Sequence, residues 1–184
     1  MQSFDTARLH LRPLGEGDEA LYYRLYTDPD LMRHIATPLS PEAAQRGFHA
    51  ALKQLGGKRM LWVIITRNGS ARGAERGILG IVPEGEAAEV GVMLFAEGQA
   101  CGFAAEVISA IADVLFQTSE IRRLWARHAV DNRAMSRVME KLEFVPQTSE
   151  SANDLSELRW QLLREEWLMR RPTRMQMALP DEER

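Results

Sequence analysis

The chain has 184 residues, of which 45% are hydrophobic and 27% are charged. This length and composition fit one folded domain with a single core, and they exclude a disordered or collagen-like chain. The formal net charge of −3 at pH 7 argues against nucleic acid as a partner, because proteins that bind it rely on Lys and Arg to neutralise phosphates.

Hydrophobic periodicity and turn residues divide the chain into ten elements. Apolar residues that alternate with polar ones predict strands, and apolar residues spaced by three and four predict helices. In chain order these are a strand at 6–14, helices at 21–26 and 41–55, strands at 60–66, 77–82 and 88–95, a helix at 104–117, a strand at 123–130, a helix at 132–142 and a strand at 158–162. This order predicts an α/β (α+β) fold, with helices flanking a mixed, mostly antiparallel sheet.

The end of the chain shows no sustained pattern. After Trp167 the apolar residues are scattered among arginines and a proline. We therefore predict a single domain over residues 1–167 and a C-terminal tail over residues 168–184, which is either frayed or an arm that contacts a partner.

Cysteine content and hydropathy indicate the cellular compartment of the protein and the ligands that it lacks. The single cysteine, Cys101, cannot close a disulfide within the chain, and no Cys/His group has the spacing of a zinc site. No signal-peptide stretch opens the sequence, and no segment reaches the ~18 apolar residues that span a bilayer. We expect a cytoplasmic protein with no metal, no membrane partner and no nucleic acid partner.

The most informative segment joins the predicted strand at 88–95 to the helix at 104–117. It contains small residues and two glycines, Gly98 and Gly102. A helix start leaves several N–H groups unpaired and carries positive potential, so small residues there let a phosphate approach. An ordinary tight turn is the alternative, because glycine is common in such connections.

The run Gln99-Ala100-Cys101-Gly102-Phe103-Ala104 resembles the (Arg/Gln)-x-x-Gly-x-(Gly/Ala) motif of the GNAT superfamily of acetyl-CoA-dependent N-acetyltransferases. Residues 6–14 look like the opening strand of the branch that includes ribosomal-protein N-terminal acetyltransferases, and Ala88-Glu89-Val90-Gly91 is similar to that branch's Glu-x-Gly strand. Residues 131–144 resemble the Asn-led helix that ends the cofactor site. The resemblance runs from Thr6 to about Leu163, and it implies the GNAT fold.

The resemblance also implies acetyl-CoA as cosubstrate. One strand would separate from its neighbour after Gly91, so that amides near Met93 and Leu94 bind the pantetheine arm. Asn132 would bond to the same arm, or it caps the helix at 132–142. The pyrophosphate would rest on the loop and helix start, at Gln99, Ala100, Cys101, Gly102, Phe103 and Ala104.

Direct acetyl transfer needs a base for the amine and an acid for the leaving thiolate, but no protein nucleophile. Glu89 occupies the family's carboxylate position, and it is either that base or a solvated strand residue. The family's serine and tyrosine acids fall on Met135 and Met139 in this sequence. Ser136 is one residue, or about 100° of helix, out of register, so it is either a substitute acid or a surface serine.

Two further positions depart from the family pattern. Ala100 replaces a frequent second glycine, which is tolerable if its φ is negative. Glu143 stands where the helix commonly ends in Gly-Phe, which predicts an altered helix exit. Cys101 lies near a helix start but has no appropriately placed histidine in the motif, so we expect it to be a small loop residue and not a nucleophile.

The predicted activity is transfer of acetyl from acetyl-CoA to a primary amine, by an acyltransferase domain at 1–167. The acceptor is left open among a protein N-terminus, an amino acid, a polyamine and an antibiotic. Its pocket is expected between the first two helices and the loop near 147–153, with Tyr22, Tyr26, His34 and Trp62 as candidates. A non-catalytic CoA-binding or interaction module is the alternative, and a homodimer is an open alternative to a monomer.

Overall fold

The computed structural model describes residues 2–67, 73–147 and 156–177. Its strands are β1 (Phe4–Asp5), β2 (Leu9–Pro13), β3 (Met60–Thr66), β4 (Glu75–Glu84), β5 (Ala87–Leu94), β6 (Arg123–Ala129), β7 (Val145–Gln147) and β8 (Glu157–Leu163). Its α-helices are α1 (Glu19–Thr27), α2 (Pro29–Met32), α3 (Pro41–Gln54), α4 (Phe103–Thr118), α5 (Arg133–Lys141) and α6 (Arg164–Met177). Short 3₁₀ helices, η1 (Glu16–Asp18) and η2 (Ala96–Gly98), precede α1 and follow β5.

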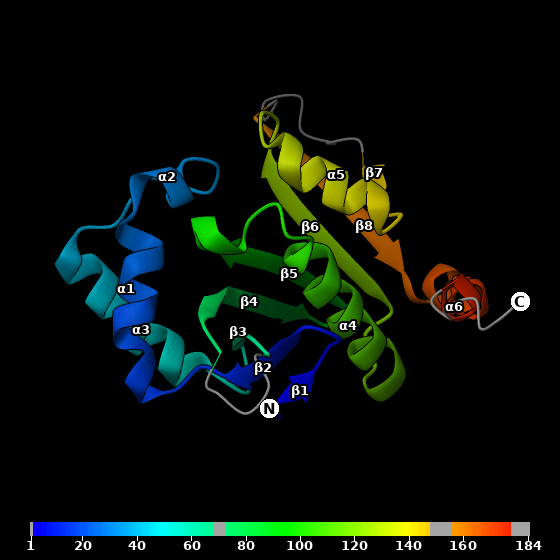
Figure 1. The fold of residues 1–184 in the computed structure, drawn as a ribbon, viewed down its shortest axis with the longest axis horizontal. Coiled ribbons are helices and arrows are strands. Elements are labelled where there is room, and N and C mark those ends of the chain that lie inside the picture. The colour runs from blue at the N-terminus through cyan, green and yellow to red at the C-terminus, as the bar shows by residue number, and fades with distance from the viewer. Residues whose placement is uncertain (1, 68–72, 148–155, 178–184) are drawn as a thin grey trace, which may run out of the picture.

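These strands form one sheet with helices on both faces (Figure 1). The strand order is β1-β2-β3-β4-β5-β6-β8-β7, and every pairing is antiparallel except that of β5 with β6. The predicted class, a mostly antiparallel sheet flanked by helices, is therefore confirmed.

Two hydrophobic clusters fill the space between sheet and helices. The larger one packs α4 and α5 against one face, and it includes Phe116, Ile108 and Met139, each no more than 1% exposed. The second packs α1 and α3 against the other face of β3, β4 and β5 through Leu25 and Phe48. The sheet thus has a face towards α4 and α5, and a face towards α1 and α3.

Several elements differ from the sequence prediction. β1, α2 and β7 were not predicted, because they span two, four and three residues and are too short to show a hydrophobic period. α6 crosses the predicted boundary at residue 167 and continues through residues expected to be tail. The division of the chain at that point stays a prediction, and residues 178–184 lie outside the described residues.

The pairing of β5 with β6 is short, and this shapes the molecule. It covers Ala87 with Arg123, Ala88 with Leu124 and Glu89 with Trp125. Beyond these pairs β5 continues to Leu94 and β6 to Ala129 without pairing to each other, and the two strands diverge (Figure 1). The separation begins after Glu89, two residues before the expected point, and we call the opening the wedge.

Candidate functional site

The open side of β5 presents backbone groups to the wedge. The Phe95 amide donates to the Arg76 carbonyl on the β4 side, at 2.8 Å. Because backbone groups alternate along a strand, the Met93 amide also faces β4, while the amides of Val92 and Leu94 face the wedge. The sequence predicted that the amides near Met93 and Leu94 would face the wedge and bind the pantetheine arm. The register favours Val92 instead, which the motif alone did not single out.

The loop after β5 leads directly to the start of α4. Gly102, the N-cap residue, has φ of +77° and provides no side-chain cap, so the first N–H groups of a sixteen-residue helix lack a side-chain partner there. Ala100 has φ of +56°, which is the left-handed region and not the negative value that the sequence reading required. The Gln99 amide nitrogen donates to the Leu94 carbonyl at 3.0 Å, which ties the loop to the strand end.

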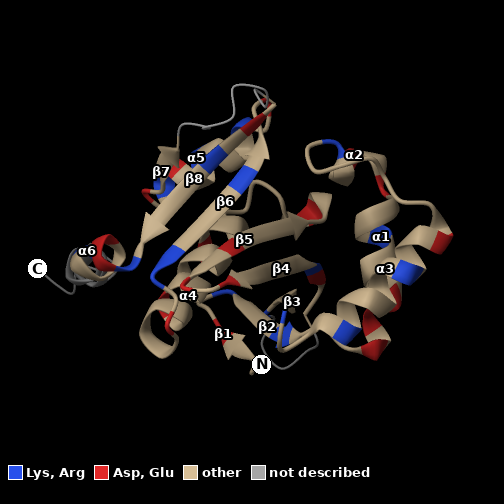
Figure 2. Cartoon of the chain, turned by 180° about the vertical axis from the view of Figure 1, so that it is seen from behind, with Lys and Arg blue, Asp and Glu red and all other residues tan. Residues whose placement is uncertain are grey.

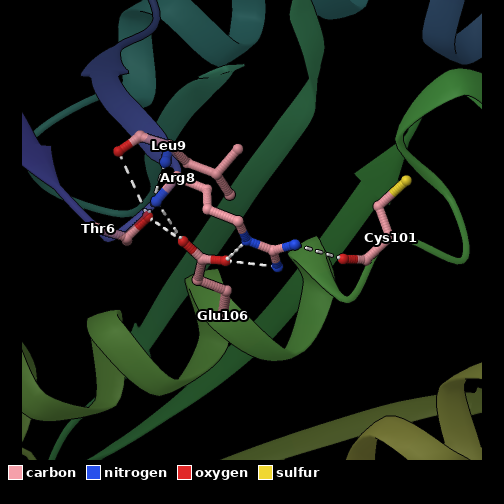
Figure 3. Close-up of polar contacts among 5 residues, drawn as sticks. All are labelled: Thr6, Arg8, Leu9, Cys101 and Glu106. Carbon is pink, nitrogen blue, oxygen red and sulfur yellow. Dashed lines mark hydrogen bonds and ion pairs between the residues drawn. The ribbon is translucent and has the colours of Figure 1, made fainter. Parts of the chain in front are cut away.

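Arg8 and Glu106 brace this loop (Figure 3). The Arg8 guanidinium pairs with Glu106 at 2.7 Å and donates to the Cys101 carbonyl at 2.9 Å. Thr6 Oγ1 and the Arg8 amide also donate to Glu106. Burial opposes ionisation of this carboxyl, but the hydrogen bonds from Thr6 and Arg8 outweigh it and lower the pKa of Glu106.

Sequence reasoning did not identify this brace, although it did single out residues 6–14 and the loop. The two parts are about a hundred residues apart in the chain, and no local pattern links them. Arg8 also lies over the Phe103 ring, 4.8 Å from its centre. The loop is therefore held from the turn between β1 and β2, while its own Cys101 side chain is exposed and, among the described residues, makes a single long contact to the Glu97 carbonyl.

Glu89 and Gly91 lie on the sheet face away from α4, beside the wedge. Arg127 Nε donates to Glu89 Oε1 at 3.1 Å, and Arg127 also approaches Glu157 at 3.5 Å. The hydrogen bond with Glu89 is the main reason that the pKa of Arg127 is raised. Gly91 is exposed, and a Cβ built on it would meet no atom within 4 Å. There is consequently open space next to the Glu89 carboxylate.

The start of α5 lies at the open end of the wedge, opposite the start of α4 (Figure 1). Asn132 accepts a hydrogen bond from the Met135 amide at 3.1 Å, so it does cap this helix. Ser136 is half-buried, and its hydroxyl points to the Asn132 carbonyl at 3.5 Å. Met139, at the family's tyrosine position, is fully buried in the hydrophobic core and has no proton to donate.

One contact joins two distant elements, the segment after α2 and the turn between β6 and α5. His34, just after α2, approaches Asp131 of the β6–α5 turn at 3.0 Å. The other expected pocket residues differ in position: Tyr22 and Trp62 are 4% exposed, so both belong to the core. Tyr26 stacks on Tyr22, and its burial raises its pKa. Most of the expected loop at 147–153 lies outside the described residues.

The described residues contain neither a metal-binding group nor a membrane-spanning helix. No three His, Cys, Asp or Glu side chains in this part of the chain are grouped so that they could hold a metal ion. None of the described helices is long and apolar enough to cross a membrane.

Comparisons with known proteins agree with the geometry. A family model described as an acetyltransferase (GNAT) domain matches residues 8–145. No protein of curated function matches the sequence. Solved structures with the same fold include a spermidine N-acetyltransferase from Vibrio cholerae in complex with CoA and spermine, which is 19% identical over 87% of this chain and 98% of that chain, with a TM-score of 0.74.

Two further structures are comparably similar. A putative acetyltransferase from T. thermophilus is 21% identical over 97% of this chain and 98% of that chain, with a TM-score of 0.75. An acetyltransferase from Agrobacterium tumefaciens is 23% identical over 88% of this chain and 94% of that chain, with a TM-score of 0.73. At these identities the structural likeness shows the fold alone.

Proposed function

Because the chain belongs to the GNAT acetyltransferase family, with acetyl-CoA as the acetyl donor, we propose that it transfers the acetyl group directly to a primary amine. The observation that carries this proposal is the wedge. It opens where β5 and β6 stop pairing, and the uncapped start of α4 lies at its open end. A thioester could then reach the sheet centre while its phosphates remain at the helix start.

The residues at the helix start fit a pyrophosphate. Gly102 is exposed, and its left-handed backbone, with that of Ala100, turns successive amides outward. Ala104 is small enough to allow close approach. These residues, with Gln99, Cys101 and Phe103 in the same loop, are our proposed diphosphate site.

The pantetheine arm would lie along β5. The amides of Val92 and Leu94 are placed to bind it, and Asn132 keeps an amide nitrogen that is not needed for its cap. In this role Val92 replaces Met93 of the sequence prediction.

Glu89 is the proposed acceptor of the amine proton. The open space over Gly91 lets an amine lie next to its carboxylate, and Arg127 fixes that carboxylate in position. Ser136 remains the proposed acid. Because its side chain is half-buried, we propose that a water molecule carries the proton from it to the thiolate. Direct transfer can proceed with water in that role.

The acceptor is proposed as a protein N-terminus or a small-molecule amine, and the N-terminal acetyltransferase branch is proposed on the resemblance of residues 6–14. The alternative is a non-catalytic CoA-binding module, which the absence of a polar residue at Met135 and Met139 favours. A cytoplasmic setting and a homodimer remain predictions.

Thermal melting tests cofactor binding. Acetyl-CoA at a hundred times its dissociation constant should stabilise the protein by about 2.7 kcal/mol, because it binds only the folded loop. AMP, which lacks the pantetheine arm, should give a much smaller shift. Negligible shifts with both compounds would contradict the cofactor site.

A variant with an added negative charge at the start of α4 tests the proposed diphosphate site. Replacement of Gly102 is unsuitable because its φ is positive. Ala104→Glu should abolish the shift by repelling the pyrophosphate, while a carboxylate in the first turn favours the helix itself. Ser109→Glu, farther along α4, should keep the shift.

Release of CoA with a panel of amines then separates an enzyme from a binding module, which would bind without turnover.

A further inference from the structure

The loop before α4 presents a row of backbone donors without acceptors. Among the described residues, no amide from Ala100 to Ala105 donates to a backbone acceptor, whereas the amides on either side, those of Gln99 and Glu106, do. Gly102, the N-cap residue, adds no side-chain bond. Such a row binds an anion only if its N–H groups stay free and keep their direction.

Arg8 controls one peptide group within this row. Its Nη1 donates to the Cys101 carbonyl at 2.9 Å. The C=O and N–H of a trans peptide point in opposite directions, and none of the described peptide bonds is cis, so the Gly102 amide is directed away from Arg8. In a continuous α-helix the Cys101 carbonyl would accept from Ala105, four residues later. The bond from Arg8 occupies this carbonyl and leaves the Ala105 amide free.

The charge of Arg8 does not explain its position. A helix N-terminus carries positive potential, so a cation beside it is unfavourable. Glu106 cancels this charge through Nε and Nη2, each at 2.7 Å, and the guanidinium lies between that carboxylate and the Cys101 carbonyl (Figure 3). Figure 2 shows acidic and basic residues interspersed along the described strands and helices, so recognition of an anion depends on local groups such as those of the loop. What Arg8 adds to the loop is a fixed hydrogen bond.

We propose that Arg8 is a positioning residue for acetyl-CoA: it holds the Cys101 carbonyl and so keeps the amides at the start of α4 free and directed towards the diphosphate. The inference rests on the proposed diphosphate site. It gives the turn between β1 and β2, which lies outside the motif at 99–104, a part in cosubstrate binding. Because the diphosphate and the thioester are at opposite ends of the pantetheine arm, Arg8 should affect binding and not the rate of the chemical step.

Arg8→Met tests the proposal. Its dissociation constant for acetyl-CoA, measured by isothermal titration calorimetry, should be about tenfold higher than that of the wild type, because a hydrogen bond from a charged donor is lost. The same ratio is expected for dephospho-acetyl-CoA, which lacks only the ribose phosphate, and kcat at saturating acetyl-CoA should hardly change. The ratio should persist at high salt, which screens charges but does not restore the bond. Equal affinities of the two proteins for the dephospho compound, or at high salt, would overturn the inference, because Arg8 would then act through its charge.

Arg67→Met is the matched control. Arg67 Nη1 donates to the Thr6 carbonyl of the same turn, also at 2.9 Å, so this variant removes an equivalent bond from the turn but none from the Cys101 carbonyl. It should keep the affinity for acetyl-CoA. If it weakens binding as much as Arg8→Met does, general loosening of the turn explains the effect, and the positioning role of Arg8 is refuted.

A second variant separates binding from folding. Arg8→Met leaves the Glu106 carboxylate without its ion-pair partner, whereas Arg8→Met/Glu106→Gln removes both charges and keeps the bonds from Thr6 and from the backbone amide at position 8. This double variant should fold and show the same loss of affinity. Wild-type affinity in the double variant would contradict the inference. If instead the wild type itself does not bind acetyl-CoA, the proposed diphosphate site fails, and this inference with it.

Discussion

Two residues without the freedom of glycine hold a left-handed backbone, one in the candidate site and one after the C-terminal end of α5. Ala100 has φ of +56° and Glu143 has φ of +61°, and both occupy positions where the resembled family commonly has glycine. A left-handed conformation costs a residue with a Cβ about 1–2 kcal/mol. Replacement by glycine removes this cost, but only part of it is recovered as stability, because glycine loses more backbone entropy on folding than other residues do.

Ala100→Gly should therefore raise the free energy of unfolding by up to about 1 kcal/mol. Urea denaturation without ligand measures this directly. Ala96→Gly, in the short helix η2, is the control and should destabilise, because its backbone gains nothing from glycine. A destabilised Ala100→Gly protein would show that the positive φ is not strained.

Glu89 permits a test of its charge. Glu89→Gln keeps the size of the side chain but removes its basicity, so kcat should fall by ~10²–10⁴ while acetyl-CoA affinity hardly changes. The defect should diminish as pH rises towards the pKa of the acceptor amine, because more amine then arrives unprotonated. A pH–rate profile of both enzymes, measured where chemistry limits the rate, checks the prediction.

Glu157→Gln is the matched control, because Glu157 also approaches Arg127 but belongs to β8 and not to β5. If it loses as much kcat as Glu89→Gln, the role of Glu89 is to hold Arg127 and not to accept a proton. Wild-type kcat in Glu89→Gln near neutral pH would remove Glu89 from the mechanism.

At the scale of the elements, two sides of β5 serve the proposed reaction. Its outward backbone groups face the wedge, and the space over Gly91 is the proposed place of the acceptor amine. Gly91→Leu should fill that space without a backbone clash, because its φ is not in the left-handed region and no atom lies within 4 Å of the added Cβ. Turnover should fall by ~10² or more through exclusion of the amine, while the melting shift with acetyl-CoA is retained.

Gly80→Leu is the control for Gly91→Leu, because the same side chain is added where there is no open space. Gly80 pairs with Gly91 across the strands, but a Cβ there would lie 3.1 Å from Leu61. That variant should lose stability in the absence of any ligand. If Gly91→Leu also melts far below wild type, the space over Gly91 is filled in solution and the acceptor path must lie elsewhere.

Long elements could be predicted from the sequence, whereas contacts between residues remote in the sequence could not. β3, β5, β6, α3 and α4 each have seven or more residues, so their periods identify them. α6 was missed because its range includes Pro172, a residue that normally ends a helix. The loop at Gln99 to Ala104 was recognisable by motif, but its brace by Arg8 and the pairing of Glu89 with Arg127 join residues remote in sequence.

For the whole molecule, Glu106 joins the N-terminal strand region to α4. Its pKa is lower in the folded protein than the ordinary value of 4.5, so its contribution to stability is fully present above about pH 4.5 and is lost as pH falls through the lower folded value. Asp18 acts in the same direction: burial opposes its ionisation, but hydrogen bonds from Arg12 and Gly15 lower its pKa.

Glu106→Gln should lower the free energy of unfolding by about 2 kcal/mol at pH 7, because hydrogen bonds to a charged group are lost. The difference from wild type should narrow below pH 4. Urea denaturation at pH 7, 5 and 3.5 measures it, with Glu140→Gln on the exposed side of α5 as the control. A difference that stays constant with pH would show that the ionised form of Glu106 is not the stabilising one.

The short seam between β5 and β6 also bears on how the sheet unfolds. β1 to β5 are paired to each other in sequence order, and β6, β8 and β7 are paired among themselves, whereas only three residue pairs join the two groups. Proteins open in cooperative units that follow such divisions, so the two groups are expected to exchange their amide hydrogens at different rates. A molecule bound in the wedge contacts both groups at once, and acetyl-CoA would then make the whole sheet unfold as one unit.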